Sequence, residues 1–287
     1  MALYELHQRP EQQEPVLVMA LEGWIDAGLG GGGAMAALLG ALDPQLVATF
    51  DSDILLDYRA RRPMITIVDG VNQEVTWPQV QLRAGRDVED HDVLVLTGPE
   101  PDHQWRAFAD SVCELAGTLG VRMAVGLGAF PAPVPHTRPA PVAATATDGD
   151  LVAQVGFVPG TVNVPGGVQA VLERRFAEAG VPAMSLWARV PHYVSGMPYP
   201  EASARLLEAL SSVAGITVDT TDLREAAANA RRRIDDLMAG SEEHLAMLRQ
   251  LEAQADAEQA GPELAFGNLP TGDELAAELE RFLRDEG

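Results

Sequence analysis

Short apolar runs separated by longer mixed segments fill the first three quarters of the chain. The runs VLVMAL at 16–21 and DVLVLT at 92–97 lack the polar alternation of a half-exposed strand. Unbroken apolar runs of this length are typical of strands that are covered on both faces by helices. The same reasoning predicts further strands at residues 46–50, 64–68, 79–82, 121–127, 142–147 and 184–190.

The segments between these runs have the length and composition of helices. Helices are predicted at residues 31–42, 103–119, 167–179 and 200–214. Asp102 is in position to cap the second of them, and Gly120 is in position to end it. Strands that alternate with helices in this way predict a three-layer α/β fold with a mostly parallel sheet.

From Thr221 onward the composition changes to alanine, glutamate, arginine and leucine. Apolar positions at helical spacing mark one face, at Leu223, Ala227, Ala230, Ile234 and Leu237. A second helix is expected from His244 to about residue 257. Thr271 and Glu274 have capping-box spacing for a last helix. We therefore expect an α/β domain over residues 1–220 and a C-terminal helical appendage over 221–287, made of a helical hairpin and one more helix.

The charge and composition restrict the classes of function. The 287 residues include 42 acidic and 20 basic ones, for a net charge of -22, which disfavours nucleic acid and anionic membranes as partners. Every basic residue is arginine, so a Walker A phosphate loop and a Schiff-base lysine are excluded. The polar start of the chain, the lack of a long apolar stretch and the single Cys113 favour a cytoplasmic protein.

The glycine run GLGGGG satisfies the G-x-G-x-x-G pattern of a dinucleotide-binding turn. That turn needs its first glycine at the end of a strand, whereas six residues, EGWIDA, intervene here and include Glu22 and Asp26. Carboxylates beside a diphosphate are unfavourable. We therefore favour close packing of a helix start over nucleotide binding. The residues of this packing turn are Gly28, Gly30, Gly31, Gly32 and Gly33.

The segment PHTRP presents His136 and Arg138 between prolines that stiffen the backbone. The pair is suited to holding a carboxylate or phosphate, with the histidine as acid or base. The alternative is a structural loop in which Arg138 pairs with an acid such as Glu22 or Asp26, and in so acidic a chain we favour it.

The segment RVPHYVSGMPYP follows a predicted strand, at the end where open α/β sheets bind ligands. His192 and Tyr193 in this segment either contribute to a binding site or satisfy each other as buried polar groups. Together the candidates for one binding cleft are Glu22, Trp24, Asp26, His136, Arg138, His192 and Tyr193. No complete catalytic set, metal motif or cofactor motif accompanies them, so no catalytic residue, metal or cofactor is expected.

Four segments in this order resemble the proteasome assembly chaperone 2 (PAC2) family: LEGWIDAG, PHTRP, VPGGVQAVL and ARVPHYVSGMPYPEAS. The resemblance covers about residues 15–215. The C-terminal extension and the arginine-only, alanine-rich composition fit an actinobacterial member. The resemblance implies a fold like that of nucleoside phosphorylases, without an established activity or cofactor. The chain ends RDEG, so the hydrophobic–tyrosine–any-residue ending of archaeal proteasome activators is not expected to operate here.

These observations favour a non-catalytic, oligomeric assembly or interaction protein, with a proteasome-related protein as its partner. We expect a homo-oligomer, with a trimer as the first hypothesis. The main alternative is a small-molecule binder or an enzyme of the nucleoside phosphorylase or hydrolase type that uses a cleft around His136, Arg138 and His192. A purely structural oligomer, held together by the helical hairpin, is the third interpretation.

Overall fold

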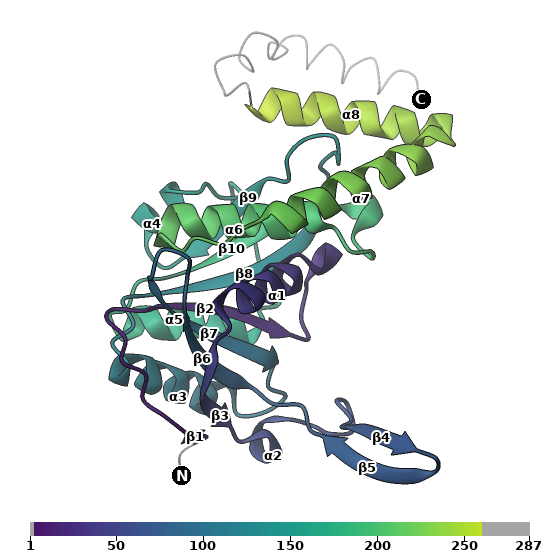
Figure 1. Cartoon of the computed structure of the whole chain (residues 1–287). Coiled ribbons are helices and arrows are strands. Elements are labelled where there is room, and N and C mark those ends of the chain that lie inside the picture. The colour runs from purple at the N-terminus through teal and green to yellow at the C-terminus, as the bar shows by residue number, and fades with distance from the viewer. Residues whose placement is uncertain (1–2, 260–287) are drawn as a thin grey trace, which may run out of the picture. The chain divides into compact units, whose positions relative to one another are not determined.

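The computed structural model describes residues 3–259, and an eight-stranded sheet forms its centre (Figure 1). The strand order is β1-β3-β6-β7-β2-β8-β10-β9. The strands are β1 (Tyr4–Leu6), β2 (Val16–Glu22), β3 (Gln45–Phe50), β6 (Gln81–Arg86), β7 (Asp92–Pro99), β8 (Met123–Ala132), β9 (Val142–Ala146) and β10 (Ala183–Pro191). Every one of these except β1 overlaps a predicted strand, although β6 starts two residues late and β8 extends five residues beyond its predicted end.

The sheet is mixed, so the prediction of a mostly parallel sheet is wrong outside its centre. Strands β7, β2, β8 and β10 are parallel neighbours, whereas β1, β3, β6 and β9 pair antiparallel. The parallel strands are linked by helical crossovers. In contrast, a tight turn at residues 87–91 joins β6 to β7, and such a short connection permits only antiparallel pairing.

Helices cover both faces of the sheet. On one face, α1 (Gly30–Leu42) packs against α6 (Pro200–Ala214); on the other, α3 (Trp105–Thr118) packs against α5 (Val168–Glu178) (Figure 1). Short helices α2 (Ser52–Leu55) and α4 (Gly149–Ala153) lie in connections. The four long helices match their predicted positions within two residues. The α/β layering follows from the unbroken apolar strands, because both faces of each need cover.

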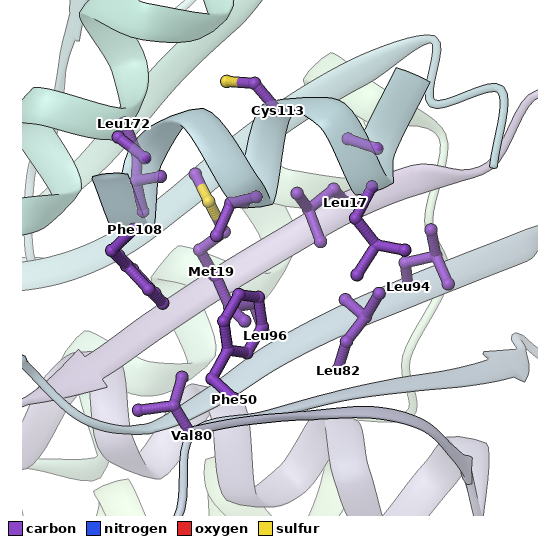
Figure 2. Packing of buried hydrophobic residues seen from close by; sticks show 14 of the residues in the cluster. Leu17, Met19, Phe50, Val80, Leu82, Leu94, Leu96, Phe108, Cys113 and Leu172 are labelled. Carbon is purple, nitrogen blue, oxygen red and sulfur yellow. The ribbon is translucent and has the colours of Figure 1, made fainter. Parts of the chain in front are cut away.

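The main core lies between the sheet and the layer of α3 and α5 (Figure 2). Leu17 and Met19 of β2 point into it, together with Phe50, Phe108 and Leu172. The rings of Phe50 and Phe108 meet edge to face, with centroids 5.0 Å apart. Each fully buried side chain of this kind contributes about 1.5–3 kcal/mol, which makes this layer a principal source of stability.

Asp102 does not cap α3, contrary to the prediction. The helix begins at Trp105 after Gln104, and no side chain accepts a hydrogen bond at its cap. The Asp102 carboxylate instead accepts from the backbone N–H of Asp57 at 2.8 Å and forms an ion pair with Arg61. A guanidinium and an N–H from the 57–61 loop therefore satisfy it, and it fixes that loop to the start of α3.

Strands β4 (Met64–Val68) and β5 (Val71–Thr76) form a separate antiparallel hairpin outside the main sheet (Figure 1). The sequence predicted β4 but not its partner. Asp69 and Gly70 connect them, both with positive φ, in a two-residue loop of the kind favoured in hairpins. Every residue of both strands is exposed.

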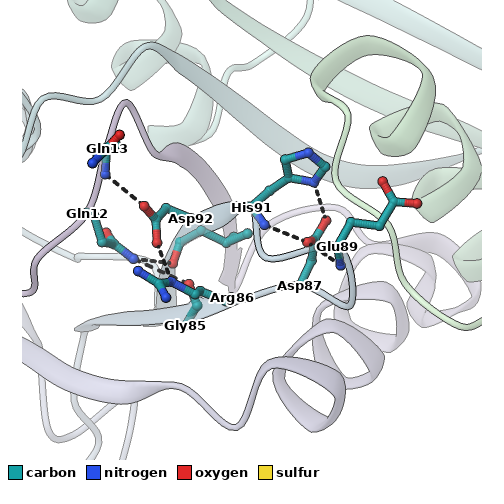
Figure 3. Close-up of polar contacts among 9 residues, drawn as sticks. Gln12, Gln13, Gly85, Arg86, Asp87, Glu89, His91 and Asp92 are labelled. Atoms are coloured by element: carbon teal, nitrogen blue, oxygen red, sulfur yellow. Dashed lines mark hydrogen bonds and ion pairs between the residues drawn. The ribbon is translucent and has the colours of Figure 1, made fainter.

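A buried carboxylate fixes the turn between β6 and β7 (Figure 3). Asp87 accepts hydrogen bonds from the backbone N–H groups of Glu89 and His91, from His91 Nδ1 at 3.0 Å, and from the N–H of Thr217 at 2.8 Å. Burial would raise the pKa of Asp87, but the bonds from Thr217 and His91 hold it below the ordinary 3.8. The carboxylate thus joins the turn to the segment that follows α6.

The chain divides into two compact units, one ending at Ile234 and the other beginning at Asp235. The final described helices are α7 (Thr221–Ala239) and α8 (Glu242–Gln259), and both overlap ranges in which helices were predicted. The predicted helix at Thr271 and Glu274 lies outside the described residues. Within residues 3–259, no helix is both long and apolar enough to cross a bilayer.

Candidate functional site

Three of the four family segments are joined by hydrogen bonds near the carboxyl ends of β2, β8 and β10. We call LEGWIDAG, with the glycine run that follows it, the first motif, PHTRP the second motif and ARVPHYVSGMPYPEAS the third motif. The backbone N–H of Gly28 donates to the carbonyl oxygen of Ser195, and the N–H of Tyr199 donates to the carbonyl oxygen of Gly28, each at 2.8 Å. These bonds join the first motif to the third. The N–H of His136 donates to the Tyr193 hydroxyl at 2.9 Å, which joins the second motif to the third.

The glycines of the first motif lie against neighbouring backbone and small side chains. A Cβ on Gly31 would lie 2.9 Å from the carbonyl oxygen of Leu127, and a Cβ on Gly30 would lie 2.8 Å from Cβ of Ala129. The Ser203 hydroxyl of α6 donates to the carbonyl oxygen of Gly30 at 2.9 Å. The start of α1 therefore approaches β8 and α6 more closely than any residue with a side chain permits.

Asp26 occupies the N-terminus of α1. Its Oδ1 accepts from the N–H of Gly31 at 2.7 Å and its Oδ2 from the N–H of Gly32 at 2.9 Å. Burial raises the pKa of Asp26, while the N–H groups of Gly32, Gly31 and Gly30 act against that rise. A dinucleotide-binding fold places its phosphates on these N–H groups. Here a carboxylate of the chain itself accepts their hydrogen bonds.

The carboxylate of Glu100 accepts a hydrogen bond at the N-terminus of α5, as that of Asp26 does at α1. Its Oε1 accepts from the N–H of Val168 at 2.5 Å, and its own N–H donates to the carbonyl oxygen of Glu22 at 2.6 Å. The sequence analysis missed Glu100. The available signal was an acid directly after β7 together with the Gly-Gly pair that precedes α5. Both helix N-termini at this edge are thus occupied by carboxylates.

His136 is buried against Tyr193, whereas His192 is exposed. His136 Nδ1 lies 2.8 Å from the Tyr193 hydroxyl oxygen, and the two rings meet edge to face at 5.8 Å. The hydroxyl accepts from the backbone N–H of His136, so it can donate its own proton to Nδ1. His192 stacks edge to face on Tyr193 at 5.3 Å from the solvent side. The buried histidine–tyrosine pair therefore forms between the second and third motifs.

Arg138 is half-buried, and its Nη1 donates to the hydroxyl oxygen of Thr137 at 3.4 Å. Its pairing with Glu22 or Asp26 stays a prediction. Glu22 is exposed at the end of β2. Trp24 is half-exposed and lies on Gly167, because a Cβ there would be 3.0 Å from the indole Cδ1. The seven candidates thus differ in exposure: one is buried (His136), three are half-buried (Asp26, Arg138 and Tyr193) and three are exposed (Glu22, Trp24 and His192).

Exposed apolar side chains gather in the first and third motifs. We call Trp24, Ile25, Leu29 and Met197 the edge patch. The backbone bonds from Gly28 to Ser195 and Tyr199 join the segment that contains Leu29 to the segment that contains Met197. Leu29 has a left-handed backbone, with φ 53° and ψ 37°. The sequence analysis did not single out Ile25, Leu29 or Met197.

One surface hollow of the described structure is not lined by the motif residues. That hollow lies at the amino end of β10 and includes Asp148, Arg174, Glu178 and Pro182. Arg174 pairs with Glu178 in it at 3.3 Å. Across the described part of the chain, no three histidine, cysteine, aspartate or glutamate side chains converge in a way that could hold a metal ion.

A sequence profile of the PAC2 family matches residues 20–238. Rv2714 of Mycobacterium tuberculosis, a protein of unknown function, is 38% identical with a TM-score of 0.82, covering 91% of this chain and 93% of that one. Rv2125 of the same organism, described as a proteasome-assembly chaperone homologue, is 35% identical with a TM-score of 0.76, covering 82% and 99%.

The archaeal proteasome activator PbaB of Pyrococcus furiosus is 18% identical with a TM-score of 0.64, covering 83% of this chain and 99% of that one. At this level of identity the likeness concerns the fold alone. No protein with a curated function matches the chain.

Proposed function

The chain belongs to the PAC2 family as a member of the actinobacterial type, and from this we propose that it is a non-catalytic, self-associating protein that assists the assembly of a proteasome-related partner. The partner class is suggested by the relative described as a proteasome-assembly chaperone homologue, which is 35% identical. We also propose a nucleoside phosphorylase-like α/β domain over residues 1–220, a helical appendage over 221–287 and a cytoplasmic location.

The β4–β5 hairpin is the observation that carries self-association. Large apolar side chains on it are 40–74% exposed: Met64, Ile65, Ile67, Val68, Val71 and Val75. An isolated two-stranded hairpin is marginally stable in water, and exposed apolar clusters of this kind mark interaction sites. A second protein surface that covers the hairpin accounts for both features.

The carboxylates at the sheet edge support a non-catalytic role. A phosphate or a nucleotide bound there would compete with Asp26 at α1 and with Glu100 at α5 for the helix N–H groups. Bringing an anion beside two carboxylates is unfavourable. This argues against the phosphorylase alternative, because a phosphorylase takes phosphate as a substrate.

Sedimentation of the full-length protein tests self-association. We expect an oligomer, and we expect the double variant Ile65→Ser with Ile67→Ser to sediment at a lower mass. Val88→Ser is the matched control, because Val88 is equally exposed but lies outside the hairpin. A wild-type protein that is monomeric at micromolar concentration contradicts the proposal.

The assembly role is tested with purified actinobacterial proteasome α and β subunits. We expect the wild-type protein to change the rate at which the core particle forms on a native gel, and the hairpin variant to have a weaker effect. An unchanged rate, without co-sedimentation with either subunit, counts against the role. A thermal shift with nucleosides plus phosphate would instead favour the enzyme alternative.

A further inference from the structure

We propose that the β4–β5 hairpin of one copy docks on the edge patch of a second copy. The proposal rests on the proposed self-association and adds to it the surface that receives the hairpin. That surface is formed by Trp24, Ile25, Leu29 and Met197 at the carboxyl ends of the parallel strands.

Leu29 is the first reason to assign a partner to the edge patch. Left-handed backbone is unfavourable for a residue as bulky as leucine, and glycine or asparagine is the usual occupant. The side chain of Leu29 is nevertheless 58% exposed, so burial within one copy does not compensate for the strained backbone. A strained residue that stays exposed is best explained by a contact outside the single chain.

The hairpin has a face suited to such a contact. In its register, Ile65 lies opposite Val75, and Ile67 lies opposite Asn72, so these four side chains share one face. Three of the four are apolar. Thr66, Glu74 and Thr76 lie on the other face together with Met64, Val68 and Val71. The acid of β5 is therefore absent from the face that carries Ile65, Ile67 and Val75.

The face assigned to the contact is open to solvent in the single chain. Its apolar side chains Ile65, Ile67 and Val75 are 50%, 64% and 40% exposed, and exposed apolar clusters of this kind mark interaction sites.

Charged residues next to the edge patch complement those at the base of the hairpin. Arg59 and Arg62 are exposed at the base of the hairpin, and within the described residues neither forms an ion pair. Glu22 is exposed and directly precedes Gly23 and Trp24 of the first motif. Because the chain carries a net charge of -22, two copies repel each other unless local charges are complementary. The arginines of one copy and Glu22 of the next supply that complementarity.

The two surfaces lie near each other on one copy without covering each other. A Cβ on Gly23 would lie 2.7 Å from Nη2 of Arg61, so the base of the hairpin reaches the first motif. The apolar residues of both surfaces are still exposed. The contact therefore joins two different surfaces of neighbouring copies, and such a head-to-tail contact closes into a ring when the rotation allows it.

Leu29→Asn is the sharpest test, because asparagine tolerates left-handed backbone. In sedimentation equilibrium of the full-length protein, we expect it to weaken self-association at least tenfold while the melting temperature of the dissociated chain stays the same or rises. Val88→Ser again serves as the exposed control. Unchanged association of Leu29→Asn, with the hairpin variant dissociated, overturns this assignment and leaves the proposed self-association standing.

A charge exchange provides an independent test. Glu22→Arg and Arg62→Glu should each weaken association about fivefold or more, and the chain that carries both substitutions should recover most of the loss. Recovery requires the two positions to meet across the interface. Additive losses in the double variant overturn the assignment. If neither the hairpin variant nor the patch variants change the mass, the proposed self-association through the hairpin fails as well.

Discussion

The carboxylate of Asp26 accepts a hydrogen bond from the backbone N–H of Gly31, with Oδ1 2.7 Å from the nitrogen. The contact connects the two halves of the opening motif, since Asp26 belongs to GWIDAG and Gly31 to the glycine run. It gives the acid a structural role as a cap and at the same time occupies the position of a bound phosphate. One hydrogen bond thus explains why a glycine-rich turn occurs here beside an acid.

Removal of this cap should destabilise α1. Asp26→Ala leaves the N–H groups of Gly31 and Gly32 without acceptors, and loss of an N-cap costs about 0.5–2 kcal/mol. Urea unfolding at pH 7 measures the difference in the free energy of unfolding. Asp26→Asn, which keeps one acceptor oxygen, should fall between wild type and alanine.

The pH dependence of this cap has a definite sign. The pKa of Asp26 is raised in the folded state, so the folded protein binds more protons than the unfolded chain between the ordinary value of 3.8 and the raised one. The free energy of unfolding of wild type, relative to Asp26→Asn, should therefore increase as the pH falls through that window. A difference that decreases on acidification contradicts the assignment.

Gly31→Ala should strongly lower the free energy of unfolding, because its Cβ would lie 2.9 Å from the carbonyl oxygen of Leu127. That oxygen belongs to the backbone of β8, so it cannot move away unless the strand moves. Overpacking of this kind costs about 1–3 kcal/mol. Gly40→Ala, in the same helix, is the matched control, because nothing lies within 4 Å of its Cβ. We expect that substitution to stabilise by about 0.5–1 kcal/mol. Equal thermal shifts in both variants would show that close approach is not the reason for the glycine.

The apolar pattern was sufficient to locate most strands and helices, because a strand covered on both faces is apolar at every buried position, as at residues 93–96 of β7. The pattern did not predict that β3, β6 and β9 pair antiparallel with their neighbours, because strand direction depends on the connections rather than on local composition. The hairpin partner β5 was missed because VNQEVT has a polar pattern, although Asp69-Gly70 is a strong hairpin signal.

The site was less predictable than the fold. His136 and Tyr193 lie 57 positions apart, so only the fold shows that they meet. Glu100 was missed because it lies 68 positions before Val168, so the acid and the Gly-Gly pair could not be connected by local spacing. The strain at Leu29 depends on a backbone angle, which no apolar pattern encodes.

Asp87 should anchor the segment after α6. Asp87→Ala removes the acceptor of four hydrogen bonds, and we expect a loss of about 2–4 kcal/mol at pH 7. Because its folded pKa is lowered, the stabilisation is present above the ordinary value of 3.8 and decreases as the pH falls through the folded pKa. Urea unfolding from pH 7 to pH 3 measures this. Amide exchange at Thr217 should become faster in the variant, and an unchanged rate there would contradict the anchor.

Tyr193→Phe separates a structural from a chemical role for the buried pair. It removes the hydroxyl that accepts from the N–H of His136 and contacts its Nδ1, so the melting temperature should fall by an amount equivalent to about 1–3 kcal/mol. His192→Ala, exposed on the same tyrosine, should change stability by less than about 0.5 kcal/mol. Both variants should keep the sedimentation behaviour of wild type, because neither side chain belongs to the hairpin or the edge patch. If Tyr193→Phe leaves stability unchanged but removes a thermal shift caused by a nucleoside or phosphate, the pair belongs to a ligand site instead.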